Sequence, residues 1–312
     1  MKNITIIGSG SFGCALAYLF SKKNNVKIWS FKEEEANYIN NEHKCIYLSD
    51  LKLDEKIKCY LKYEDALSDS DIIVLVTPSF AFRKTCEDIK KYVKNQDIIL
   101  ATKGMDNGEL LSSIIEENFD KKPSIISGPS HAEQIIMDIK TYVNFYGNKE
   151  LINILENDNF KLIYNEDSIG MQVGASLKNI ISLGCGILEG LDYDTNTISY
   201  FITEGLNEIK KISNKLGGKE ETIYGLSGLG DLLTTCLSLD SRNKRAGILL
   251  AKGKTIEEIK KQVGMTIEGL DALSNAYILI NKYNLDCKII KNIYDIIYNN
   301  KDIKSIILNC TP

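Results

Sequence analysis

Histidine is the residue that this sequence most lacks, with two among 312 residues. A zinc site or a serine-hydrolase site built on several histidines is therefore nearly excluded. Long apolar runs are missing as well. No segment approaches the roughly 20 apolar residues of a membrane helix, and the longest buried-looking runs, such as 71–76, have strand length. Because a strand-like run begins directly after Asn3, we expect no signal peptide.

The sequence also lacks paired cysteines and an excess of one charge. Its eight cysteines include no Cys-x-x-Cys spacing, which favours reduced thiols in a cytoplasm. The net charge of −4 gives no electrostatic footprint for nucleic acid or an anionic membrane. Any anionic ligand must therefore be held by a few local cations. The apolar fraction of 44% is ordinary for a globular protein, and the length suits two domains.

The first half alternates short apolar runs with amphipathic stretches, such as 12–22 and 81–93. The runs are too short for helices and are bounded by turn signals. This alternation predicts an α/β fold, with a Rossmann-type parallel sheet covered by helices on both faces. A further run at 141–145 could add an edge strand. The predicted strands are 4–7, 26–29, 72–76, 98–101 and 124–127.

The pattern changes at about Asn165, after which helical spacing replaces strand candidates. We expect an all-helical C-terminal domain, with no internal repeat and no low-complexity linker. The predicted division is a dinucleotide-binding domain at 1–165 and a helical substrate and catalytic domain at 166–312. The predicted helices are 173–188, 198–216, 244–252, 256–263, 268–283 and 288–299.

A glycine-rich loop follows the first strand and opens a helix. It reads Gly8-Ser9-Gly10-Ser11-Phe12-Gly13. The three glycines allow a tight turn, close approach of the backbone to a pyrophosphate, and close packing of helix on strand. The helix start presents unpaired N–H groups to the phosphates. Because the loop lies between a strand and a helix, it predicts a dinucleotide site rather than merely a tight turn.

The end of the second strand leaves the choice of cofactor open between NAD and NADP. An NAD site usually has an acid there, but this sequence reads Trp29-Ser30-Phe31-Lys32. Lys32 could meet a 2′-phosphate, and the missing acid removes the main repulsion against one. Equally, Lys32 and the following Glu33 to Glu35 could be an exposed helix start.

Three loops lie where ligands bind, beyond the carboxyl ends of predicted strands. The loop 76–78 is expected to line the cofactor. Lys103 follows the strand at 98–101, and beside the other two loops we favour a functional over a surface role for it. In the loop 127–132, Gly128 and Ser130 offer backbone and hydroxyl donors.

Polar residues also interrupt the helical half. Lys178 and Asn179 lie in an otherwise apolar helix, where a lysine must snorkel or find partners because a buried ammonium is costly. Desolvation and a neighbouring cation would lower its pKa and make it a usable general base. Asp231 follows the glycine-rich run 225–230, either as a helix N-cap, as a functional carboxylate, or as both.

A basic segment opens the next predicted helix, with Asp240 or Ser241 as its cap. Arg242 gives planar bidentate contacts, and Asn243 adds an amide, so with the free N–H groups they suit a phosphate. Basic residues are mildly unfavourable at this end of a helix, and a bound anion would explain their placement.

Taken in order, these segments resemble the bacterial-type NAD(P)-dependent glycerol-3-phosphate dehydrogenases over nearly the whole chain. The resemblance rests on the glycine loop and on a series of short motifs that are specific only together. They are Tyr47-Leu48 with Leu51-Lys52-Leu53, Ala-Thr-Lys-Gly at 101–104, Ser-Gly-Pro-Ser at 127–130, Leu-Lys-Asn at 177–179, Gly-Leu-Gly-Asp at 228–231, Thr-Thr-Cys at 234–236 and Ser-Arg-Asn at 241–243.

The resemblance implies interconversion of sn-glycerol 3-phosphate and dihydroxyacetone phosphate with NAD or NADP, supplying glycerol 3-phosphate for phospholipid synthesis. It implies a cytoplasmic homodimer with no metal and no membrane insertion. Lys178 would accept the C2 hydroxyl proton, with Lys103 and Asp231 completing the catalytic set. The implied substrate contacts are Lys103, Gly128, Ser130, Lys178, Asn179, Asp231, Thr235, Ser241, Arg242 and Asn243. The implied cofactor contacts are Gly8, Gly10, Ser11, Phe12, Gly13, Phe31, Lys32, Lys103, Ala132, Arg242 and Glu268.

The sequence departs from the family at several positions. The family commonly has Trp at Phe12, Arg or His at Phe31, and an aromatic residue at His131, and its arginine-containing segment reads 194–198 here. These departures concern cofactor preference and affinity rather than reaction class. The alternatives are another Rossmann-plus-helical dehydrogenase, for a 3-hydroxy acid, ketopantoate or an opine, and a non-catalytic dinucleotide sensor. The related dehydrogenases would not need Ser241-Arg242-Asn243, and the presence of Lys178, Asp231 and Arg242 together counts against a sensor.

Overall fold

The computed structural model describes residues 1–238, 241–264 and 266–307. The chain divides into two compact units. The first comprises residues 1–102 and 111–166, and the second comprises 103–110 and 167 onward. Sequence analysis placed a single boundary after residue 165 and did not anticipate that the segment 103–110 belongs to the second unit.

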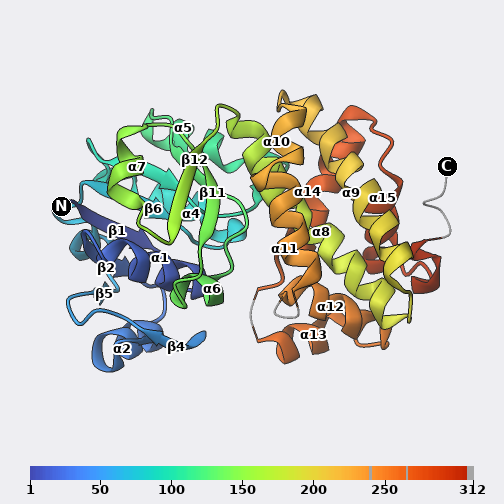
Figure 1. Cartoon of the computed structure of the whole chain (residues 1–312), viewed down its shortest axis with the longest axis horizontal. Helices are drawn as coiled ribbons and strands as arrows, with labels where there is room; N and C mark the ends of the chain where they lie inside the picture. The colour runs from blue at the N-terminus through green and yellow to red at the C-terminus, as the bar shows by residue number, and fades with distance from the viewer. Residues whose placement is uncertain (239–240, 265, 308–312) are drawn as a thin grey trace. The chain divides into compact units, whose positions relative to one another are not determined.

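The first unit is built on an eight-stranded sheet (Figure 1). All four residues of β6 (Ile72–Leu75) are buried, because helices cover both faces of its sheet. In spatial order the strands are β12 (Phe160–Tyr164), β11 (Thr141–Tyr146), β10 (Ser124–Ser127), β7 (Asp97–Leu100), β6, β1 (Asn3–Ile7), β2 (Asn25–Trp29) and β5 (Lys58–Tyr60).

The order of the strands reverses next to β1. From β1 the chain moves to β2 and β5 on one side, then returns to β6 on the other. Both pairings of β1 are parallel. The helices and short strands around this sheet are α1 (Ser11–Ser21), α2 (Glu33–Glu42), β3 (Lys44–Cys45), β4 (Leu48–Lys52), α3 (Tyr63–Leu67), α4 (Ser79–Ile89), η1 (Lys90–Tyr92), α5 (Leu111–Phe119), α6 (Ala132–Ile136) and α7 (Glu150–Leu155).

The five strands predicted at 4–7, 26–29, 72–76, 98–101 and 124–127 are confirmed to within one residue. The sheet is mixed rather than wholly parallel, because β10 and β11 pair antiparallel. The expectation of an edge strand at 141–145 was wrong in its position, since β11 lies between β10 and the unpredicted edge strand β12. In β12 buried and more exposed residues alternate, Phe160 and Leu162 being buried.

Among its described residues, the second unit is helical apart from one hairpin, formed by β8 (Met105–Asp106) and β9 (Glu109–Leu110). The hairpin is fastened to α14 (Glu268–Tyr283), where Asn275 Oδ1 accepts from the N–H of Gly108 at 2.7 Å. The remaining elements are α8 (Ser168–Gly190), α9 (Thr195–Leu216), α10 (Glu220–Tyr224), the π-helical turn η2 (Leu226–Gly230), α11 (Asp231–Leu237), α12 (Arg242–Ala251), α13 (Ile256–Val263), α15 (Lys288–Tyr298) and η3 (Ile303–Ile306).

Helix α8 is the centre of the second unit, and residues Gly170 to Leu188 along it are all buried. Close approach of α12 depends on two facing glycines. A Cβ on Gly186 would lie 2.0 Å from the carbonyl oxygen of Lys244, and one on Gly247 would lie 2.1 Å from that of Leu183. Any larger residue at either position would force the two helices apart.

The sequence analysis found no segment long and apolar enough for a membrane helix, and the structure corrects this statement. Helix α8 is 23 residues long, and an 18-residue window in it has mean hydropathy 1.2, so it passes a length and composition test for a membrane span. That window is entirely buried inside the protein, as is usual for the core helix of a soluble protein. The seven cysteines among the described residues are buried and form no disulfide bonds.

Candidate functional site

The glycine loop has the geometry that a dinucleotide needs. Gly8 has φ +131°, and a Cβ there would lie 2.9 Å from the carbonyl oxygen of Val76. A Cβ on Gly13 would lie 2.1 Å from the carbonyl oxygen of Gly8, whereas one on Gly10 would meet nothing within 4 Å. The first and third glycines therefore allow tight packing, and the second leaves open space in front of α1.

The start of α1 is also suited to an anion. Gly10 is its N-cap, and no side chain caps the helix. Its first residues, Ser11, Phe12 and Gly13, are three of the predicted cofactor contacts. The residues present thus fit a bound pyrophosphate.

From the sequence we expected no acidic side chain at the end of β2, but the structure has one there. Glu35, in the first turn of α2, directs its buried carboxylate back toward the strand end. Its Oε2 accepts from Ser9 Oγ of the glycine loop and, at 3.3 Å, from Ser30 Oγ. The sequence analysis treated Glu33 to Glu35 as a possible exposed helix start, which is wrong for Glu35, with 8% of its surface exposed.

Lys32 is held by the same carboxylate. Its Nζ lies 3.1 Å from Glu35 Oε1 and 3.0 Å from the hydroxyl of Tyr47. These contacts, with Tyr47 first and Glu35 second, raise the pKa of Lys32 above its ordinary value although partial burial opposes them. Phe31, beside it, is 85% exposed. The strand end therefore presents a fixed ammonium and an exposed ring over a buried carboxylate.

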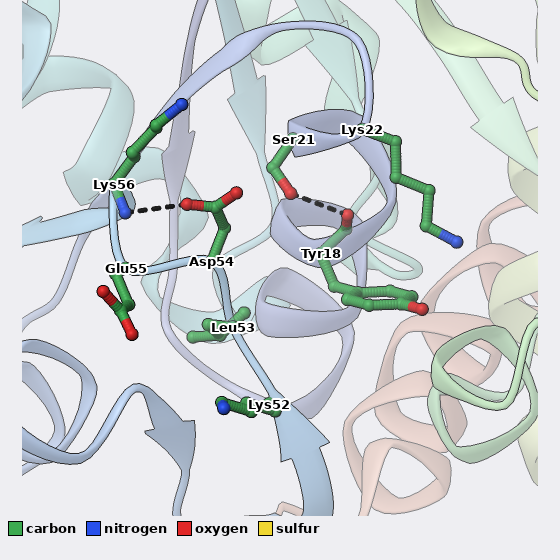
Figure 2. A pocket seen from close by; sticks show the side chains of 8 residues that line it. All are labelled: Tyr18, Ser21, Lys22, Lys52, Leu53, Asp54, Glu55 and Lys56. Atoms are coloured by element: carbon green, nitrogen blue, oxygen red, sulfur yellow. Dashed lines mark hydrogen bonds between the residues drawn. The ribbon is translucent and has the colours of Figure 1, made fainter.

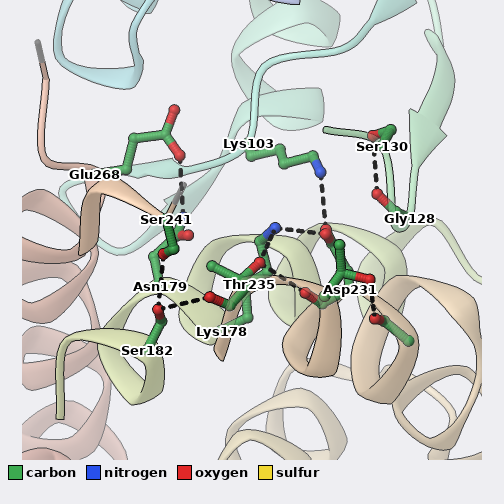
Figure 3. Close-up of polar contacts among 12 residues, drawn as sticks. Lys103, Gly128, Ser130, Lys178, Asn179, Ser182, Asp231, Thr235, Ser241 and Glu268 are labelled. Carbon is green, nitrogen blue, oxygen red and sulfur yellow. Dashed lines mark hydrogen bonds and ion pairs between the residues drawn. The ribbon is translucent and has the colours of Figure 1, made fainter. Parts of the chain in front are cut away.

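In the second unit, two lysines share one buried carboxylate (Figure 3). Lys103 Nζ lies 2.9 Å from Asp231 Oδ2, and Lys178 Nζ lies 2.5 Å from Asp231 Oδ1. Lys178 also donates to Thr235 Oγ1 at 2.9 Å. Asp231 is not a helix cap, since Gly230 occupies the N-cap position of α11. The sequence left open whether Lys178 snorkels or finds partners, and the structure shows that it has partners.

Burial sets the protonation of this cluster. It lowers the pKa of Lys178 to about 8, an effect that Asp231 opposes and Lys103 reinforces. Burial alone would raise the pKa of Asp231, but the charges of Lys103 and Lys178 outweigh it and lower that pKa below its ordinary value. The cluster therefore holds an ionised carboxylate beside a lysine that titrates near neutral pH.

A chain of amides continues from Lys178 along α8. Asn179 Nδ2 donates to Glu268 Oε2 at 3.1 Å, and Asn179 Oδ1 accepts from Asn243 Nδ2 at 2.9 Å. Asn243 Oδ1 in turn accepts from the N–H of Gly269 at 2.9 Å. Both polar atoms of the Asn243 amide thus have protein partners. A phosphate could contact this side chain only if one of these hydrogen bonds were replaced by a bond to the phosphate.

The start of α12 is capped by Ser241, whose Oγ accepts from the N–H of Lys244 at 3.3 Å. The alternative cap, Asp240, lies outside the described residues. Arg242 Nη1 donates to the carbonyl of Thr266 at 3.3 Å. Ser182, which the sequence analysis missed, connects this helix start to the lysine cluster by bonding Ser241 Oγ at 3.0 Å and donating to the carbonyl of Thr235 at 3.2 Å.

The remaining predicted residues lie in the first unit. Gly128 has φ +145°, and a Cβ there would lie 3.1 Å from Val143 Cα. Ser130 Oγ donates to the carbonyl of Gly128 at 2.9 Å. Ala132 begins α6. Their roles in substrate and cofactor binding stay predictions.

A pocket of about 530 Å³ opens in the first unit around the C-terminal part of α1 (Figure 2). It lies at the opposite end of that helix from the glycine loop. Its lining is mostly charged and exposed, and it contains no buried ionisable group. We assign it no function. The residues that line it are Tyr18, Ser21, Lys22, Lys52, Leu53, Asp54, Glu55 and Lys56.

Both units of the chain match a known protein family. Residues 3–150 match the family described as NAD-dependent glycerol-3-phosphate dehydrogenase N-terminus, and residues 167–308 match the corresponding C-terminus. The chain is 39% identical to glycerol-3-phosphate dehydrogenase [NAD(P)+] of Clostridium tetani, over 97% of this chain and 90% of that one. The chain belongs to this family.

Two further members support the assignment. The glycerol-3-phosphate dehydrogenase [NAD(P)+] of Fusobacterium nucleatum is 41% identical over 97% of this chain and 94% of its own. The crystal structure of glycerol-3-phosphate dehydrogenase from Coxiella burnetii superposes with a TM-score of 0.96 at 30% identity, covering 98% of each chain. The family resemblance and fold class inferred from the sequence are thus confirmed.

Proposed function

We propose that this chain interconverts sn-glycerol 3-phosphate and dihydroxyacetone phosphate, using NAD(H) or NADP(H). The observation that carries the proposal is the buried Lys103–Asp231–Lys178 cluster in a member of this family. A lysine with a pKa of about 8 is suited to exchange a proton with a hydroxyl near neutral pH.

A nicotinamide cofactor, which the glycine loop from Gly8 to Gly13 would hold, would supply the hydride transfer between itself and C2 of the substrate. Lys178 in its neutral form accepts the proton of the C2 hydroxyl, and as an ammonium it returns that proton in the reverse direction. Because burial lowers the pKa of Lys178 to about 8, both forms are accessible near neutral pH. The ammonium of Lys103 stabilises negative charge that develops on the C2 oxygen.

Asp231 keeps both lysines in place. With one carboxylate oxygen on each ammonium, it holds two like charges close together that would otherwise repel. Thr235 Oγ1 accepts a second hydrogen bond from Lys178 Nζ and so fixes the direction of that N–H group. These two residues position the amine, and Lys178 performs the proton transfer.

The phosphate of the substrate is bound at the start of α12. Arg242 supplies the guanidinium, and Ser241 and Asn243 lie beside it. A chain with net charge −4 has no general attraction for anions, so these local groups must supply the selectivity for a phosphorylated substrate.

The cellular role that we propose is supply of glycerol 3-phosphate for phospholipid synthesis by a cytoplasmic homodimer. The support for this role is family membership.

A turnover assay tests the function directly. The purified chain, given dihydroxyacetone phosphate, should oxidise NADH or NADPH, and given glycerol 3-phosphate it should reduce NAD+ or NADP+. Unphosphorylated dihydroxyacetone and ketopantoate should turn over far more slowly. Preference for ketopantoate or another unphosphorylated acid would favour the related dehydrogenases. Cofactor binding without turnover of any of these substrates would favour a dinucleotide sensor.

A further inference from the structure

Asn275 of α14 holds the hairpin of the second unit with its side-chain amide. The amide oxygen accepts from the N–H of Gly108 at 2.7 Å, and the amide nitrogen donates to the carbonyl of Met105 at 3.2 Å. The same nitrogen donates to the carbonyl of Asp271, one turn earlier in α14, at 2.9 Å. An apolar side chain could make neither hairpin bond and would leave the buried carbonyl of Met105 without this donor, which costs free energy.

The hairpin itself is a compact piece of structure. Its two central residues, Asn107 and Gly108, have φ +51° and +75°, the backbone conformation of a tight two-residue turn. Met105 is buried in the hydrophobic core of the second unit, and Leu110 packs against that core. The attachment of the hairpin to α14 therefore determines where the chain just before Met105 lies.

Lys103 is in that part of the chain, two residues before Met105 and in the same unit. Its Nζ lies 2.9 Å from Asp231 Oδ2 (Figure 3). The ion pair joins one end of the segment 103–110 to α11, and the Asn275 amide joins the other end to α14. The two contacts together fix the segment that carries the ammonium.

We infer that Asn275 is a positioning residue for the proposed reaction, and that it holds the hairpin so that the ammonium of Lys103 stays on Asp231. The inference rests on the proposed function, because Lys103 has a catalytic role only there. Asn275 acts through the hairpin and not by contact with substrate. Such positioning matters for the rate, since a shift of about 1 Å in a reacting group can cost about a hundredfold.

The position of Lys103 also affects the protonation of Lys178. Burial has the largest effect and lowers the pKa of Lys178. Of the charged groups that act on this amine, Asp231 and Glu268 raise its pKa, and Lys103 lowers it. If Lys103 moves away, its effect weakens and the pKa of Lys178 rises. Oxidation of glycerol 3-phosphate, which needs the neutral amine, then requires a higher pH.

The variant Asn275→Leu keeps the size of the side chain but makes neither hairpin bond. Its kcat for dihydroxyacetone phosphate should fall at least about tenfold, and the pH profile of kcat/KM for glycerol 3-phosphate should move to higher pH. Asn275→Ala has a smaller side chain, which leaves room for water at the two backbone groups. It should move the profile in the same direction.

The matched control is Asn292→Leu, at a buried asparagine of α15. The amide nitrogen of Asn292 donates to the carbonyls of Ser305 and Ile306 at 2.8 and 3.0 Å. The control thus removes two hydrogen bonds to the backbone elsewhere in the same unit. Both leucine variants should melt at a lower temperature than the parent, but Asn292→Leu should leave kcat and the pH profile unchanged.

A double-mutant cycle with Lys103→Met tests whether Asn275 acts through Lys103. Once the ammonium is gone, Asn275→Leu should lower kcat no further and should not move the pH profile. Additive losses of kcat would overturn the inference, and so would an unchanged pH profile in folded Asn275→Leu and Asn275→Ala. Failure of both Asn275 variants to fold would show a structural role and would also overturn it. If the unmodified protein turned over neither dihydroxyacetone phosphate nor glycerol 3-phosphate, the proposed function itself would fail.

Discussion

The hydroxyl of Thr235 faces Lys178 only as a hydrogen-bond acceptor. It donates its own proton to the carbonyl of Asp231 at 2.7 Å, and Lys178 Nζ lies 2.9 Å from the same oxygen. With Asp231 Oδ1 on a second donor, two of the three ammonium donors are used by protein partners. The third donor is the one that would meet the substrate oxygen in the proposed mechanism, and these two protein contacts would then fix the direction of proton transfer before substrate binds.

The protonation of Lys178 predicts opposite pH profiles for the two directions. Oxidation of glycerol 3-phosphate needs the neutral amine, so its kcat/KM should rise with pH and level off above about 8, the pKa of Lys178. Reduction of dihydroxyacetone phosphate needs the ammonium, so its kcat/KM should fall above the same pH. Initial rates between pH 7 and 9.5 measure both limbs.

Asp231→Asn supplies a control for this assignment. The carboxylate raises the pKa of Lys178 against the effect of burial, so its removal should move both limbs to lower pH. Profiles that are flat in this range in both directions would show that Lys178 is not the titrating group.

Arg242→Ala should raise KM for dihydroxyacetone phosphate. A charge-assisted hydrogen bond is worth about 1.5–3 kcal/mol, which corresponds to roughly 10- to 150-fold at 1.4 kcal/mol per factor of ten. The matched control is Arg245→Ala, because Arg245 is exposed on the same helix and its loss should change KM little. Equal KM values for the parent and Arg242→Ala would remove this guanidinium from the phosphate site.

Lys32→Met should discriminate between the two cofactors. Lys32 neutralises the buried carboxylate of Glu35, and without it a 2′-phosphate would meet an uncompensated negative charge. Kd for NADPH should therefore rise at least about tenfold, while Kd for NADH stays within about threefold. The exposed Lys56→Met is the control, and a parallel change in both Kd values would contradict a contact with the 2′-phosphate.

Much of the fold was readable from local sequence because its signals are local. The strand β1, the glycine loop and α1 follow each other directly, and their hydrophobic runs and glycines need no distant residue for their interpretation. The strand β12 was missed because it is a half-buried edge strand whose alternation is short. That the segment 103–110 belongs to the second unit was also missed. Its hairpin is held by Asn275, which is distant in the sequence, so no residue near the hairpin indicates this contact.

The candidate site shows the same limit. Lys178 was recognisable because an ionisable residue in an apolar helix demands partners, but only the fold identifies those partners as Asp231 and Thr235. Glu35 illustrates the reverse case. In the sequence it is one of three consecutive acids at a helix start, and nothing local distinguishes the one that turns inward toward Ser9 and Ser30.

Lys178→Met should abolish most of the activity while leaving the fold intact. Methionine keeps the length and apolar packing of the side chain, and Asp231 retains its ion pair with Lys103, so no uncompensated buried charge is created. Loss of a positioned general base should lower kcat by at least about a hundredfold. Cofactor Kd should not change, because the glycine loop belongs to the other unit.

Lys244→Met is the control for removing a largely buried lysine from this unit. Lys244 pairs with Glu189 at 2.8 Å, away from Asp231, so its replacement should leave kcat within a few-fold. Thermal melting of both variants checks that they fold. A folded Lys178→Met protein with near-normal kcat would show that the proton passes elsewhere, to Lys103 or through Asp231 and water. Loss of folding in Lys178→Met alone would instead mark Lys178 as a structural partner of Asp231, since Lys103 would then be unable to balance that carboxylate by itself.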